Sequence, residues 1–109
     1  MIHELRIYHA LPGRLPALIA RFNDHTTKIW DRLGIQPVGF WTTMIGAAES
    51  NALTYLIAWE SLADRETKWT AFQVDAEWKR VKSESEKDGP INANISSQIL
   101  QPTAFSRLK

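Results

Sequence analysis

Three polar side chains alternate with apolar ones near the start of the chain, at Glu4, Arg6 and Tyr8. Alternate residues of a strand share a face, so these three side chains lie together. Arg6 could hold an anionic or carbonyl oxygen, and Tyr8 could orient or protonate it. The alternative is structural, with Glu4 and Arg6 neutralising each other across a dimer. The sequence leaves both interpretations open.

His25 lies three residues after Phe22 and four before Ile29, which places it on the apolar face of a predicted helix. We therefore expect it to be at least partly buried. It would then act as a general base near neutral pH, or as a core residue that hydrogen-bonds to a backbone carbonyl or to Tyr55.

Metal and nucleotide sites are not predicted. His3 and His9 have no neighbours at ligand spacing, cysteine is absent, and no His-x-x-x-His pair occurs. The chain also lacks the Gly-x-Ser-x-Gly sequence of serine hydrolases and the Gly-x-Gly-x-x-Gly sequence of dinucleotide-binding folds. We expect no cofactor.

Five tryptophans supply more large apolar surface than so short a chain can easily hide. Trp30, Trp69 and Trp78 fall on predicted buried stripes and are expected in the core. Trp41 and Trp59 fall on the middle strands and are the better candidates to line a ligand pocket, although packing explains them as well.

The periodicity of apolar residues predicts six elements that position these side chains. A period of two indicates strands, whereas a period near three and a half indicates helices; Pro16 and Ser61 mark helix starts, and Gly34 marks a helix end. The predicted elements are a strand from Ile2 to Ala10, a helix over residues 15–33, a strand over 35–45, a strand from Ala52 to Glu60, a helical region over 62–87 broken near Asp75, and a strand from Ile91 to Leu100.

The order βαββαβ predicts an α+β fold of the ferredoxin-like type, with residues 1–109 forming a single domain. Both helical regions then cover one face of an antiparallel sheet and leave the other bare. The strand at residues 52–60 looks buried on both faces, so we expect a homodimer whose sheets face each other, or a higher homo-oligomer built from it.

The faces of the strands follow from the same alternation. If Leu5 and Ile7 face the helices, then Glu4, Arg6 and Tyr8 face away from them. We expect three polar residues of the last strand to join them there and to line a polar barrel interior: Asn94, Ser96 and Gln98. In the helix that begins at Leu62, we expect Leu62, Trp69 and Phe72 to form the buried stripe.

Composition argues against two classes of partner, nucleic acids and anionic membranes. The formal charge is +1, from 13 basic and 12 acidic residues, so no net field attracts nucleic acid or an anionic membrane. No secretory signal and no apolar run of bilayer-spanning length is visible, so we expect a cytoplasmic protein.

Several segments, in order along the chain, resemble the NIPSNAP family. They are Glu4-Leu5-Arg6-Ile7-Tyr8, Pro12-Gly13-Arg14, Gly39-Phe40-Trp41-Thr42-Thr43, Ala58-Trp59-Glu60-Ser61-Leu62, Asp75-Ala76-Glu77-Trp78 and Ile99-Leu100-Gln101-Pro102. The resemblance implies a dimeric α+β barrel, an architecture shared with small cofactor-free monooxygenases and isomerases. It implies a cavity but no agreed set of catalytic residues.

Two hypotheses about function remain open. In the first, the protein binds a small organic molecule between sheet and helices, either as a binding protein or as a cofactor-independent monooxygenase- or isomerase-like enzyme. This needs an enclosed pocket lined by at least three of five residues: Arg6, Tyr8, His25, Trp41 and Tyr55. In the second, it is a non-catalytic interaction scaffold with a filled interior and an exposed apolar patch near Phe105.

Overall fold

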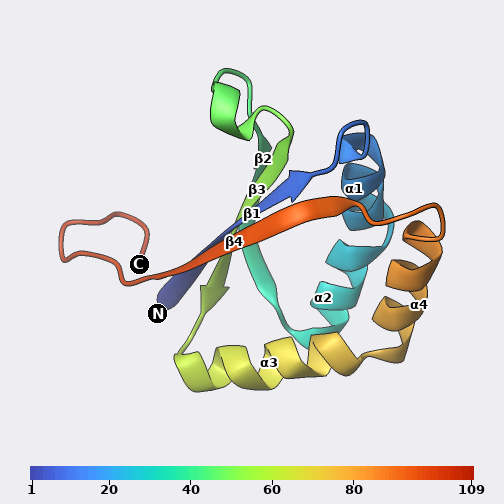
Figure 1. The fold of residues 1–109 in the computed structure, drawn as a ribbon. Coiled ribbons are helices and arrows are strands. Elements are labelled where there is room, and N and C mark those ends of the chain that lie inside the picture. The colour runs from blue at the N-terminus through green and yellow to red at the C-terminus, as the bar shows by residue number, and fades with distance from the viewer.

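The computed structural model describes residues 1–109 as a four-stranded antiparallel sheet with helices on one face (Figure 1). The sheet order is β2-β3-β1-β4, and the βαββαβ order confirms the predicted ferredoxin-like α+β fold. The elements are β1 (Ile2–Ala10), α1 (Leu15–Arg21), the π-helical turn η1 (Phe22–Thr26), α2 (Thr27–Leu33), β2 (Gln36–Thr42), the short 3₁₀ turn η2 (Ala47–Glu49), β3 (Ala52–Trp59), α3 (Leu62–Val74), α4 (Ala76–Ser85) and β4 (Asn92–Leu100).

The helix-covered face of the sheet carries Glu4, Arg6 and Tyr8, so the predicted orientation of β1 is wrong. Glu4 contacts Arg65 of α3, and the ring of Tyr8 packs against that of Phe22 of η1. The apolar side chains Leu5 and Ile7 lie on the opposite, open face. The alternation in β1 correctly predicts which side chains share a face. It does not show which of the two faces the helices cover.

The orientation of β4 agrees with the prediction. Leu5 pairs with Gln98, Ile7 with Ser96 and His9 with Asn94, so these three polar residues lie on the open face. They share it with Leu5 and Ile7, not with Glu4, Arg6 and Tyr8. The expected polar interior is therefore divided between the two faces of the sheet.

Helices α3 and α4 begin where the sequence predicted, because each has a side-chain cap. The Oγ atom of Ser61 accepts a 3.0 Å hydrogen bond from the amide of Asp64, and an Asp75 carboxylate oxygen accepts one of 3.0 Å from the amide of Trp78. Leu62 is 62% exposed, so its predicted place on the buried stripe of α3 is wrong. Trp69 and Phe72 face the sheet as predicted, and Arg65 takes the place expected for Leu62.

The first helical stretch is not a continuous α-helix. In η1 the amide of Thr27 bonds to the carbonyl of Phe22, five residues earlier, which adds one residue to that turn. The extra residue rotates the register, so Thr26 is buried and His25 is exposed to solvent. The expected burial of His25 is therefore wrong.

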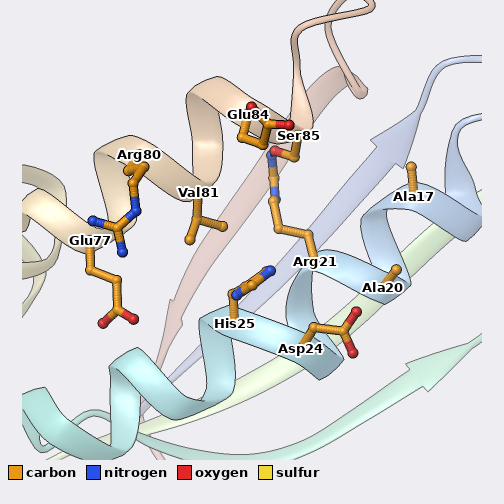
Figure 2. A pocket seen from close by; sticks show the side chains of 10 residues that line it. All are labelled: Ala17, Ala20, Arg21, Asp24, His25, Glu77, Arg80, Val81, Glu84 and Ser85. Carbon is orange, nitrogen blue, oxygen red and sulfur yellow. The ribbon is translucent and has the colours of Figure 1, made fainter.

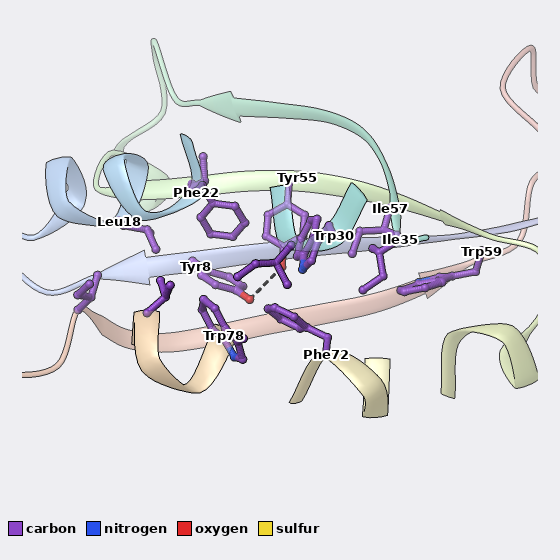
Figure 3. Packing of buried hydrophobic residues seen from close by; sticks show 14 residues of the cluster. Tyr8, Leu18, Phe22, Trp30, Ile35, Tyr55, Ile57, Trp59, Phe72 and Trp78 are labelled. Atoms are coloured by element: carbon purple, nitrogen blue, oxygen red, sulfur yellow. Dashed lines mark hydrogen bonds between the residues drawn. The ribbon is translucent and has the colours of Figure 1, made fainter. Parts of the chain in front are cut away.

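The core between sheet and helices is mainly aromatic (Figure 3). The Phe22 ring lies 5.4 to 5.7 Å from the rings of Tyr8, Trp30, Phe40 and Tyr55. Trp30 and Trp78 are buried, as predicted, and so is Trp59; Trp69 is half-buried. Rings in edge-on and tilted contact fill this layer and fix the two central strands against the helices.

The open face of the sheet has no helix over it (Figure 1). Leu5, Ile7 and Leu56 lie on it half-buried, and Trp41 is 53% exposed there. The C-terminal residues 101–109 leave the end of β4 as a loop in which Phe105 is 89% exposed. None of the helices is both long and apolar enough to cross a membrane.

Candidate functional site

Glu4 is the centre of a buried polar cluster, with its side chain fully shielded from solvent. Its carboxylate accepts five hydrogen bonds. Arg65 of α3 donates two, of 2.7 and 3.1 Å, and Arg6 donates one of 3.0 Å. Trp59 Nε1 and Ser97 Oγ donate bonds of 3.0 and 2.7 Å. One carboxylate thus ties β1 to β3, β4 and α3.

These contacts determine the ionisation of Glu4. Burial alone would raise the pKa of its carboxyl, but the hydrogen bonds from Arg65, Ser97, Arg6 and Trp59 outweigh it and lower the pKa to about 2. Glu4 is therefore a permanent anion near neutral pH. It cannot serve as a proton-transferring acid or base, and its role is to hold Arg6 and Arg65.

Arg6 extends from Glu4 to a pair of tyrosines. Its Nη1 donates to Glu4, its Nε donates to the Tyr55 hydroxyl at 2.9 Å, and its Nη2 donates to the Tyr8 hydroxyl at 3.4 Å. The guanidinium also lies 4.6 Å from the centre of the Trp69 ring. Its position is thus fixed on the inner face of the sheet.

The tyrosine pair is the part of this cluster that could act on a ligand. The Tyr55 hydroxyl donates to that of Tyr8 at 2.9 Å (Figure 3). Burial raises the pKa of Tyr55 well above its ordinary value, as does the neighbouring Tyr8, so Tyr55 stays a neutral donor. Tyr8 accepts from Tyr55 and Arg6, and its own proton has no acceptor in the protein. A chain of polarised donors therefore ends at Tyr8.

The enclosed pocket required by the first hypothesis is not formed around these residues. Arg6, Tyr8 and Tyr55 line none of the three main pockets of the chain, because aromatic rings fill the space beside them. One pocket does lie between helix and sheet. It has a volume of about 210 Å³ and is lined by Ile19, Phe22, Asn23, Thr27, Phe40 and Leu53.

This pocket backs directly onto the tyrosine pair. Phe22 and Phe40 form its inner wall, and both rings lie 5.4 Å from the ring of Tyr55. The Phe22 carbonyl accepts both the Thr27 amide and a 3.0 Å bond from Thr27 Oγ1. We call it the η1–β2 pocket.

The structure brings together four of the six residues proposed from the sequence to bind a ligand. Arg6, Tyr8 and Tyr55 form one network, and Trp59 joins it through Glu4. Two lie elsewhere: His25 on the outer surface between η1 and α4, and Trp41 on the open face of the sheet. No group of three histidine, aspartate or glutamate side chains converges on one point.

Sequence reasoning missed Arg65 and Ser97 as members of the cluster. Arg65 lies four and seven residues before Trp69 and Phe72, a helical spacing that would have placed it on the buried stripe of α3. Ser97 pairs with Arg6 across the strands. The Glu4–Arg6 pair forms within one protomer, so the expectation that it bridges a dimer is wrong.

A family model for NIPSNAP matches residues 3–107 of the sequence. The chain belongs to the NIPSNAP family. The resemblance seen in the sequence segments is thereby confirmed, and it extends over the sheet, all the helices and most of the C-terminal segment. No curated protein matches the sequence.

Solved NIPSNAP structures share the whole fold. A NIPSNAP family protein of unknown function from Agrobacterium tumefaciens is 26% identical, with a TM-score of 0.85 over 100% of this chain and 94% of that one. An uncharacterised NIPSNAP domain protein from Burkholderia xenovorans is 22% identical, with a TM-score of 0.83 over 97% and 98% of the two chains.

More distant structures extend the likeness beyond NIPSNAP. A putative antibiotic biosynthesis monooxygenase from Nitrosomonas europaea has a TM-score of 0.64 at 8% identity, over 94% of this chain and 98% of that one. At that identity the likeness concerns the fold alone, because one fold carries many unrelated activities. It places this NIPSNAP chain in the architecture predicted from the order of its elements.

Proposed function

We propose that the protein binds a compact, largely apolar organic molecule in the η1–β2 pocket. The observation that carries the proposal is the position of this pocket between helix and sheet. Only the rings of Phe22 and Phe40 separate it from Tyr55. A volume of about 210 Å³ lies below the range of drug-sized sites, so the ligand has few non-hydrogen atoms. Four of the six lining residues are apolar.

The chemistry available to such a ligand comes from the network behind the wall. Rotation of Phe22 or Phe40 would bring a carbonyl or phenolic oxygen within reach of the Tyr8 hydroxyl. Arg6 and Tyr55 polarise that hydroxyl, so it would stabilise negative charge developing on the ligand oxygen. Such charge stabilisation suits the enolate or phenolate form of the ligand: solvent would take the ligand's proton, and a monooxygenase-like reaction would use dioxygen as the oxidant.

The proposal also includes a homodimer. The open face of the sheet exposes Trp41 beside half-buried Leu5, Ile7 and Leu56, and a second copy would cover this apolar surface by a two-fold arrangement.

The alternative role, a non-catalytic scaffold, has one specific observation in its favour. Phe105 is 89% exposed at the position where such a partner surface was expected.

A chemical-shift titration with phenol and cyclohexanone tests the pocket. We expect the backbone amides of Asn23, Thr27 and Phe40 to shift together and to saturate. The variant Asn23→Trp, which places a large side chain at the pocket mouth, should abolish these shifts. Lys28→Trp, on the exposed side of the adjoining turn, should leave them intact. Shifts confined to the open face or to the Phe105 segment would support the scaffold instead.

A further inference from the structure

Arg21, the last residue of α1, carries a buried charge without a counter-ion. It is only 5% exposed, its Nε has no hydrogen-bond partner, and it forms no ion pair. Its one hydrogen bond is a long one, 3.3 Å from Nη1 to Ser85 Oγ, and its guanidinium lies 5.1 Å from the centre of the Trp78 ring. A buried guanidinium with so few partners is unfavourable unless something else compensates it.

The charges inside the protein supply only part of that compensation. Burial lowers the pKa of Arg21; Glu86, Tyr8 and Tyr55 oppose this effect without cancelling it, and the nearby Arg14 adds to it. Arg14 is itself fixed by carbonyl acceptors, with Nη2 bonds of 3.1 and 3.2 Å to Ser85 and Gly89. The guanidinium of Arg21 thus remains a cation beneath the surface that is only partly compensated and forms no ion pair.

A groove with a volume of about 650 Å³ lies beside Arg21, between α1 and η1 on one side and α4 on the other (Figure 2). This volume falls within the usual range of ligand-binding sites. Ala17, Ala20 and Val81 give it an apolar surface. Figure 2 shows the Arg21 side chain extending between the two helical segments toward Ser85, with the His25 ring in the space below it.

The acidic side chains that line the groove do not form ion pairs with its two arginines, Arg21 and Arg80. Glu77 pairs with Arg32 at 3.1 Å, and Glu84 pairs with Lys87 at 2.9 Å. Figure 2 shows the remaining acid, Asp24, turned away from the Arg21 guanidinium, and it accepts a bond from Asn23. Arg80 lines the groove and forms no ion pair.

The π-helical turn contributes to the same groove. Because η1 rotates the register, His25 lines this groove and not the core. π-Helical turns inside α-helices are rare and occur frequently at functional sites. Here it brings an imidazole to the side of the groove opposite α4.

We propose that the α1–α4 groove binds a small organic anion, a carboxylate or a phosphate ester with a short apolar chain. The acidic group would lie between Arg21 and Arg80, where it supplies the missing counter-charge, with His25 as a further donor. The apolar chain would contact Ala17, Ala20 and Val81. This site is separate from the η1–β2 pocket, and its test does not depend on the function proposed there.

Calorimetric titration with hexanoate, hexyl phosphate and neutral hexanamide tests the proposal. We expect one or both anions to bind and hexanamide not to bind; the tighter anion identifies the acidic group. Arg80→Gln should weaken the binding roughly tenfold, since a charge-assisted hydrogen bond is lost. Lys79→Gln removes the same charge from the neighbouring α4 position outside the groove and should change the affinity less than about twofold.

A second variant separates binding from folding. Arg21→Met replaces a buried, only partly compensated charge with an apolar chain of similar length, so it should leave the thermal midpoint unchanged or raise it while abolishing anion binding. The proposal is overturned if neither anion binds, if hexanamide binds as tightly, or if Arg80→Gln and Lys79→Gln weaken binding equally. Full anion affinity in a folded Arg21→Met protein would also overturn it.

Discussion

The hydroxyl of Tyr55 donates a 2.9 Å hydrogen bond to the hydroxyl of Tyr8, which joins the two central strands beneath the helices. Arg6 donates to both hydroxyls and is held in turn by Glu4. A fixed anion, a fixed cation and two tyrosine hydroxyls therefore follow one another along the inner face of the sheet. The contribution of each to stability and to ligand binding can be measured separately.

Glu4→Gln removes the only carboxylate that balances Arg6 and Arg65. Breaking a buried ion pair on one side leaves the remaining charge uncompensated, so we expect the free energy of unfolding to fall by about 3 kcal/mol. Urea denaturation measures it. Glu84→Gln, in an exposed pair with Lys87, is the control and should cost less than about 0.5 kcal/mol. A loss equal to that of the control would show that the cluster does not stabilise the fold.

The same carboxylate predicts how stability depends on acid. The pKa of Glu4 falls from 4.5 to about 2 on folding, so its contribution is complete above about pH 4.5 and is lost as the pH falls toward 2. Denaturation midpoints measured over this range should therefore decrease with acidification. In Glu4→Gln the denaturation midpoint should depend less steeply on pH than in the unsubstituted protein. The same slope in both proteins would be inconsistent with a lowered pKa of Glu4.

Tyr8→Phe leaves Tyr55 as the only tyrosine, because the chain has two. Its phenolate absorbance then reports Tyr55 alone. We expect it to titrate well above the ordinary value of 10.0 in the native protein, and near that value in urea. Since the folded pKa is the higher one, this contribution to stability is complete below pH 10 and disappears as the pH rises through the folded value. Identical native and unfolded titrations would disprove the assignment.

Trp41→Glu tests the dimer without disturbing the core, because Trp41 is half-exposed on the open face. A tryptophan buried in an interface typically contributes enough that its loss weakens the dimer at least about thirtyfold. Sedimentation velocity across a concentration series measures this. Val74→Glu, an equally exposed apolar position on α3, should leave the subunit number unchanged. If the unsubstituted protein sediments as a monomer, the open face is not a dimer interface.

The sequence was sufficient to predict the fold because its local signals agreed. The caps at Ser61 and Asp75, the glycine after Leu33 and the alternation in β1, β3 and β4 each marked an element boundary that the structure confirms. The segments that resemble the NIPSNAP family imply the same order of strands and helices. Two element bounds were wrong: the helix over residues 15–33 contains a π-helical turn, and the strand predicted over 35–45 ends at Thr42.

The candidate site was predicted less well, for two physical reasons. Alternation shows that Glu4, Arg6 and Tyr8 share a face, but the partner residues that allow charged side chains to face inward come from α3 and β4, far along the chain. The π-helical turn shifts side chains by one residue and leaves no signal in apolar periodicity, so His25 was assigned to the wrong side. Both errors arise from contacts that single segments do not encode.

Native mass spectrometry of the protein purified gently from its own host tests the central claim most directly. We predict a dimer in which each subunit retains one small mass, in the unsubstituted protein and in Lys28→Trp, while Asn23→Trp carries none. Such a pattern would locate the retained molecule in the η1–β2 pocket and open its chemical identification. If none of the three proteins retains a small molecule, or if all three retain the same one, the claim that this pocket binds a ligand is contradicted.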